Sequence, residues 1–153
     1  MRWTGVVSLV GVAAILFVGL EMMHPAARGS QHRPVIEGAK VPVEVDEILD
    51  RACRDCHSTQ TEWPWYAQLP PMSTMIAKDV EAGRAFMNLS AWSGYSRGRK
   101  LGYLASIASA ATAGQMPPRR YTMIHGEARL SETERQKIAD WATEEMHRLA
   151  AGK

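Results

Sequence analysis

The sequence predicts an all-α protein that consists mainly of one small helical domain. Apolar residues recur at intervals of three and four along several stretches, which is the period of a helix that buries one face. Ser131 and Glu134 form a capping box directly before one of these stretches, a pattern typical of a helix start. No stretch alternates between apolar and polar residues for long enough to predict a strand.

Length and composition agree with a single globular domain. The chain has 153 residues, enough for one domain with its own core. Apolar residues make up 46% and charged residues 22%, an ordinary balance for a globular protein. The net charge of +2 is far below the basic excess typical of nucleic-acid-binding proteins, so we expect no nucleic acid as a partner.

The N-terminal segment predicts export from the cytoplasm. Residues 3–20, WTGVVSLVGVAAILFVGL, carry no charge, and as a helix they would span ~27 Å, close to the hydrocarbon core of a bilayer. We expect residues 1–23 to be an uncleaved membrane anchor. The alternative is a cleaved signal peptide, but a cut near HPAARG would place His24 or Pro25 where small residues are preferred. Residues 24–42, rich in proline, alanine and glycine, are expected to be a linker before a domain at 43–150.

The helices of that domain are predicted in chain order. The first carries a stripe that includes both cysteines, and the second is expected to start at Ser73 as N-cap and to run to about Met87. The third covers about 97–113 and ends at Gly114, and the fourth follows the capping box. Their predicted inward faces are Val45, Ile48, Leu49, Ala52, Cys53 and Cys56; Ile76, Val80 and Met87; Leu101, Leu104, Ile107, Ala108 and Ala111; and Ile138, Trp141, Ala142, Met146 and Leu149.

The candidate functional motif is the segment CRDCH, which holds the only two cysteines of the chain, Cys53 and Cys56, and then His57. A redox dithiol usually follows a strand at a helix N-terminus, and here the cysteines end a helical stripe. A structural zinc site needs four ligands, and the remaining histidines are not paired at ligand spacing. The C-x-x-C-H pattern in an exported helical domain instead favours covalent attachment of one haem c, with His57 as an iron ligand.

The second axial ligand is predicted to be Met116. It stands in AGQMPPRRY, after a helix stop and before Pro117 and Pro118, in a stiff loop that can present a thioether. Methionine with histidine is a known axial pair in cytochromes c. His125 is the rival ligand, Met123 is a weaker candidate, and an open position is the remaining alternative.

Several neighbouring residues have two possible roles. Trp63, Trp65 and Tyr66 follow the motif closely and are expected either to wall off the haem or to form ordinary core. A carbonyl within LPPMS, residues 69–73, is a candidate acceptor for the second ring nitrogen of His57. Arg120 and Tyr121 follow Met116 closely and are the candidates to meet a haem propionate, with a solvated face as the alternative.

From about Pro34 to Trp141, the chain resembles the bacterial haem-binding domain family of small exported proteins. The resemblance rests on EILDRACRDCHSTQTEWPWY, DVEAGRAFMNLSAW and GQMPPRRYTMIHGEARLSETERQKIADWA, in that order. It implies a cytochrome-c-like helical fold, thioether bonds at Cys53 and Cys56, His57 as the proximal ligand and Met116 as the distal candidate. The chain departs from the family pattern where His125 is followed by Gly126 instead of proline.

These observations predict a monohaem c-type cytochrome domain that is tethered to the bacterial inner membrane and faces the periplasm. Its expected work is one-electron transfer, with redox proteins or membrane oxidoreductases as partners. The alternative is a haem-based sensor or peroxidase-like protein with an open or displaceable distal position.

Overall fold

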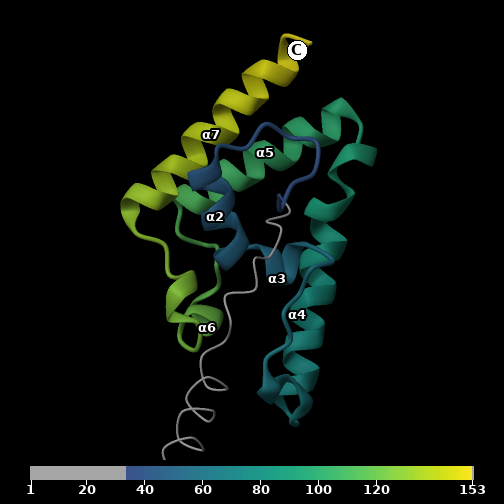
Figure 1. The fold of residues 1–153 in the computed structure, drawn as a ribbon, viewed down its shortest axis with the longest axis vertical. Helices are drawn as coiled ribbons and strands as arrows, with labels where there is room; N and C mark the ends of the chain where they lie inside the picture. Colours follow the sequence, from purple (N-terminus) through teal and green to yellow (C-terminus); the bar gives the residue numbers. More distant parts are fainter. Residues whose placement is uncertain (1–33, 153) are drawn as a thin grey trace, which may run out of the picture. The chain divides into compact units, whose positions relative to one another are not determined.

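A computed structural model describes residues 34–152, and Pro34–Lys153 forms one compact unit. The described residues are helical and contain no strand, which confirms the predicted all-α class (Figure 1). No helix among residues 34–152 is long and apolar enough to cross a membrane. The predicted anchor at residues 1–23 lies outside the described residues.

The first described helix confirms the predicted apolar stripe but ends before the motif does. Helix α2 (Val43–Ala52) buries its predicted apolar face, Val45, Ile48, Leu49 and Ala52. Cys53 then leaves helical geometry, with φ −126° and ψ −33°, and the short helix α3 (Arg54–His57) begins at the next residue. The expectation of one helical stripe running through Cys56 was therefore wrong, because the helical backbone is interrupted at Cys53 and α3 is a separate helix.

Helix α4 (Met72–Phe86) follows the 3-10 turn η1 (Trp65–Gln68). The predicted N-cap at Ser73 was wrong by two positions: Pro71 is the N-cap residue, and the Ser73 N–H donates to the Leu69 carbonyl at 2.9 Å. Val80 and Met87 are buried as predicted. A second 3-10 helix, η2 (Leu89–Gly94), adds Leu89 and Trp92 to the core.

Helices α5 (Arg97–Thr112) and α7 (Glu132–Ala150) pack side by side and form the main scaffold (Figure 1). The Ser96 side chain caps α5, and Gly114, with φ +63°, follows its end as predicted. The capping box of Ser131 and Glu134 is present at the start of α7. In the chain, the short helices α6 (Arg119–Thr122) and η3 (Gly126–Ala128) come between α5 and α7.

The predicted linker is in part core. Val35 and Ile36 are fully buried, and the Val35 N–H donates to Oδ1 of the buried Asp46 at 2.9 Å. The Trp141 indole N–H of α7 donates to the Lys40 carbonyl at 2.8 Å. The packed domain therefore begins near Pro34 and not at residue 43, because side chains of α2 and α7 bond to the backbone of Val35 and Lys40. Residues 24–33 of the predicted linker lie outside the described part.

Candidate functional site

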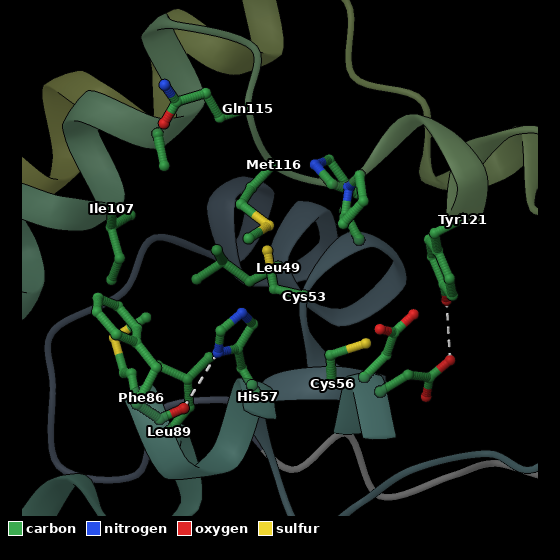
Figure 2. Close-up of a pocket in the computed structure, with 18 of the residues that line it drawn as sticks. Leu49, Cys53, Cys56, His57, Phe86, Leu89, Ile107, Gln115, Met116 and Tyr121 are labelled. Carbon is green, nitrogen blue, oxygen red and sulfur yellow. Dashed lines mark hydrogen bonds between the residues drawn. The ribbon is translucent and has the colours of Figure 1, made fainter. Parts of the chain in front are cut away.

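The predicted site residues meet at one cavity. It has a volume of about 760 Å³ and lies among α2, α3, α4, α5 and the segment after α5. Cys53, Cys56, His57 and Met116 all line it, although Met116 is far from the other three in sequence. Figure 2 shows His57 and Met116 reaching into this pocket from different elements, with Cys53 directly below Met116 in this view and Cys56 to the right of His57. A cavity of this size is within the ~300–1,000 Å³ range of cofactor and ligand sites.

The orientation of His57 is fixed by a backbone carbonyl. Its Nδ1 lies 3.1 Å from the Met87 carbonyl oxygen, which can only accept, so Nδ1 carries the hydrogen and donates it. Nε2 keeps its lone pair and is available to a metal, which is the usual arrangement of a metal-binding histidine. The predicted acceptor in residues 69–73 was wrong: the carbonyl comes from the end of α4, where Met87 caps the helix.

The approach of α4 to the motif depends on a glycine. A Cβ atom at Gly83 would lie 2.5 Å from the Cys56 carbonyl oxygen, closer than any real contact. Gly83 therefore permits the α4 backbone to rest directly on α3. Sequence reasoning missed this residue, although a glycine inside a helical pattern is a known signal of close packing.

Arg84, next to that glycine, holds the chain that follows the motif. Its Nε donates to the carbonyl of the buried Ser58, and Nη2 donates to Thr61 Oγ1, both at 2.7 Å. Thr61 in turn donates to the Asp55 carbonyl at 2.6 Å. These bonds fix the turn after His57, a role that the sequence pattern did not reveal.

The two thiols are unlike those of a redox dithiol. Burial raises the pKa of Cys53 to about 12, and burial followed by the Asp55 charge raises the pKa of Cys56. Both cysteines are half-buried, and reactive dithiols have lowered pKa values, so the raised pKa values do not favour a redox dithiol. In the part of the chain that the structure describes, no three His, Cys, Asp or Glu side chains gather as a metal cluster, so the geometry does not favour zinc either.

Met116 is the methionine best placed to face His57. The N–H groups of Gln115 and Met116 both point to the Ala110 carbonyl, at 3.0 and 3.4 Å, which folds the chain back toward the cavity after α5. The Met116 side chain is 44% exposed, so the thioether can adjust. Met87 also lines the cavity but is packed into the core, and Met123 is 80% exposed and lies outside the lining.

His125 lines the cavity with both ring nitrogens already engaged. Nε2 lies 2.6 Å from the Tyr66 hydroxyl, and Nδ1 lies 3.1 Å from Glu127 Oε1. Its ring also stacks on Tyr121, with centroids 4.2 Å apart and planes 15° apart. If His125 bound iron through Nε2, its hydrogen bond to the Tyr66 hydroxyl would be lost. The geometry therefore favours Met116 as the second axial ligand.

The two tryptophans after the motif have neither predicted role. Trp63 is 55% exposed and Trp65 is 76% exposed, and neither lines the cavity. Both expectations, haem wall and core, were wrong for them, because Pro64 and the turn η1 direct these rings outward. Phe86 and Tyr121 supply the aromatic lining instead.

Arg120 lines the cavity and is already paired. Its Nε and Nη2 donate to the two carboxylate oxygens of Asp79 on α4, at 3.0 and 2.6 Å. Hydrogen bonding and the Asp79 charge raise the pKa of Arg120. Tyr121 donates to Asp55 Oδ2 at 3.0 Å (Figure 2), so the two residues predicted to meet a propionate both hold carboxylates of the protein itself.

The donor set fits a haem. An imidazole nitrogen with a free lone pair and a thioether sulfur are an iron-ligand pair, and two nearby thiols can bond to the porphyrin periphery. The lining is mainly apolar, with Leu49, Val80, Leu89 and Ile107 among its residues, as a porphyrin requires.

Comparisons with known proteins agree with this fit. The chain is 27% identical to cytochrome c peroxidase Ccp of Escherichia coli (strain K12), over 92% of this chain and 32% of that protein. The chain thus spans about a third of the length of that relative. No solved structure matches the chain. The family model described as haem-binding domain matches residues 10–144, and the chain belongs to this haem-binding domain family.

Proposed function

We propose that this chain is a monohaem c-type cytochrome domain that transfers single electrons. The observation that carries the proposal is the pairing within one cavity of His57, whose Nδ1 is engaged by the Met87 carbonyl, with Met116. Histidine with methionine is the ligand pair of electron-carrying cytochromes c. When bound, the haem would supply a reversible one-electron change.

The residues of the motif would hold the group covalently. Cys53 and Cys56 would hold it by thioether bonds, each thiol adding its sulfur and its hydrogen across one vinyl group of the porphyrin. His57 would bind through Nε2 and Met116 through its sulfur. Apolar walls then exclude water, which together with a methionine ligand favours a higher reduction potential.

The proposed location is the periplasmic face of a bacterial inner membrane. The uncharged segment at residues 3–20 supports a tether or an export signal. The expected partners are redox proteins or membrane oxidoreductases that dock briefly near the exposed part of the site. Phe86, which is 58% exposed and lines the cavity, is a candidate contact for such a partner.

The absorption spectrum of the oxidised, haem-loaded protein tests the ligand pair. A methionine–iron bond gives a weak long-wavelength charge-transfer band. We expect this band in the wild type and in Met123→Ala, whose side chain lies outside the cavity lining, and its loss in Met116→Ala. A wild type without the band, or a band that survives in Met116→Ala, would contradict the assignment.

A second candidate is a sensor or a peroxidase-like function with a displaceable Met116. The name of the Escherichia coli relative and the 44% exposure of Met116 favour it. Carbon monoxide added to the ferrous protein separates the two candidates: a firmly bound methionine resists it, whereas a displaceable one gives rapid binding in the wild type as in Met116→Ala.

A further inference from the structure

A chain of aromatic rings leads from the surface to the cavity. Trp65, 76% exposed, meets Tyr66 edge to face with centroids 5.7 Å apart. The Tyr66 hydroxyl forms a hydrogen bond with His125, and the His125 ring stacks on Tyr121 with centroids 4.2 Å apart. The last two rings line the cavity. We call these residues (Trp65, Tyr66, His125 and Tyr121) the aromatic chain.

The protons in the middle of this chain have defined positions. The Glu127 carboxylate can only accept, so Nδ1 of His125 carries a hydrogen and donates it at 3.1 Å. A backbone hydrogen bond, helped by the bond from His125, keeps the pKa of Glu127 below its ordinary value, so this carboxylate is ionised. In the neutral imidazole, Nε2 of His125 then accepts the Tyr66 hydroxyl hydrogen at 2.6 Å, giving a carboxylate–imidazole–phenol series.

We propose that Tyr66 is a redox-active tyrosine that relays one electron from the haem cavity to a strong one-electron oxidant at the surface. While Tyr66 is oxidised, His125 holds the phenolic proton of Tyr66. The inference rests on the proposed function for the presence of a haem in the cavity. The oxidant is of the class of oxygen-centred organic radicals, which are strong enough to oxidise a phenol.

The step balances in electrons and protons. The oxidant takes one electron from Tyr66, directly or through Trp65, and becomes an anion. The phenolic O–H bond breaks, the proton crosses to Nε2 of His125, and the imidazolium that forms is stabilised by Glu127. Tyr66 then recovers one electron by way of Tyr121, and the proton returns from His125 to the phenolic oxygen; a ferrous haem in the cavity would supply that electron and become ferric.

The surroundings of Tyr66 distinguish it from the other tyrosines. Tyr121 donates to Asp55, but a carboxylate is a much weaker base than an imidazole, with an ordinary pKa of about 3.9 against about 6.5. Tyr95 and Tyr103 form a separate edge-to-face pair, where the Tyr95 hydroxyl accepts from the Asn88 N–H. Tyr66 thus combines an imidazole base with contact to an exposed indole.

Pulse radiolysis of the ferrous, haem-loaded full chain tests the relay. Azidyl radicals oxidise tryptophan and tyrosine side chains by one electron, and the readouts are the tyrosyl signal in freeze-quenched electron paramagnetic resonance and the appearance of ferric haem. In the wild type we expect a tyrosyl radical followed by haem oxidation, with the first step slowed in deuterium oxide because a proton moves with the electron.

Three variants make the test specific. Tyr66→Phe should lose the deuterium-sensitive phase and the haem oxidation that follows it, whereas Tyr103→Phe, in the separate ring pair, should keep both. His125→Gln can still accept a hydrogen bond but is a poor proton acceptor, so it should lose the phase as Tyr66→Phe does. An unchanged phase in Tyr66→Phe, or a tyrosyl radical that never oxidises the haem, overturns the proposal.

The result is separable from the test of the ligand pair. A protein that shows the methionine band but has no deuterium-sensitive phase overturns the relay and leaves electron transfer by the His57–Met116 site in place. A protein that lacks the band yet shows the phase and loses it in Tyr66→Phe supports the relay and overturns Met116 as the ligand.

Discussion

His57 shows how a single side chain is prepared by its backbone surroundings. The Met87 carbonyl is available because Met87 is the extended C-cap residue of α4, whose N–H alone bonds back to the helix, and the carbonyl accepts the Nδ1 hydrogen of His57 at 3.1 Å. The same bond turns the ring and sets its tautomer, and both effects make Nε2 a better ligand. The histidine is thus oriented by a residue 30 positions further along the chain.

Glu134 is a second residue whose state depends on its bonds. Hydrogen bonds from the Ser131 backbone and side chain, and the nearby Arg51, lower its pKa from 4.5. Its ionised form therefore stabilises the fold above about pH 4.5, and this contribution is lost as the pH falls through the lowered pKa. The charge also lies in the first turn of α7, where the helix dipole favours it.

We expect Glu134→Gln to lower the free energy of unfolding by up to about 1 kcal/mol at pH 7. Glutamine can also complete a capping box, so the substitution removes mainly the charge. Urea unfolding of both proteins between pH 7 and pH 3 measures the effect, and the difference should shrink below pH 4.5. A constant difference across this range would show that the charge is not its source.

At the scale of elements, the contact between α3 and α4 decides whether the site exists. Gly83 lets α4 touch the backbone of Cys56, and Arg84 then bonds the turn after His57. The end of α4 supplies the Met87 carbonyl. The last turn of α4 and the residue that caps it therefore position the motif.

We expect Gly83→Ala to destabilise the protein by about 1–3 kcal/mol, because the new methyl group would overlap the Cys56 carbonyl and force α3 and α4 apart. Urea unfolding measures the loss, and the haem content of the purified protein should fall with it. Gly102→Ala in α5 is the matched control: a Cβ there meets nothing within 4 Å, so that variant should gain up to about 1 kcal/mol. Equal effects in the two variants would contradict the packing argument.

At the scale of the whole molecule, the cavity is bounded by helices from both halves of the described chain. Its walls come from α2 to α5 and from the segment after α5, so its shape depends on the α5–α7 scaffold. A haem in this cavity would bind the folded state and not the unfolded chain, and such a ligand raises the stability of the fold.

We therefore expect the double substitution Cys53→Ser with Cys56→Ser to separate attachment from binding. The wild type should retain its haem after acid–acetone extraction, and the variant should release it, because thioether bonds survive this treatment. Thermal unfolding should occur at a lower temperature in the variant as its haem dissociates. Haem retained by the variant after extraction would contradict attachment through these thiols.

Sequence reasoning predicted the features that depend on residues close together in the chain, and it missed those that depend on residues far apart. The capping box, the α5 stop at Gly114 and the inward faces of α2 and α7 were predicted correctly, because propensity, capping and helical period act within a few residues. The outward turn of Trp63 and Trp65 and the burial of Val35 and Ile36 were missed, because distant packing partners decide them.

The sequence by itself determined the all-α class, the CRDCH motif and its candidate distal methionine, because these depend on local pattern and residue chemistry. Only the tertiary structure decided which carbonyl orients His57, why Gly83 is a glycine, and that His125 joins Tyr66 and Glu127. Each of these contacts joins residues brought together by packing, and their separation along the chain leaves no periodic signal from which they could be read.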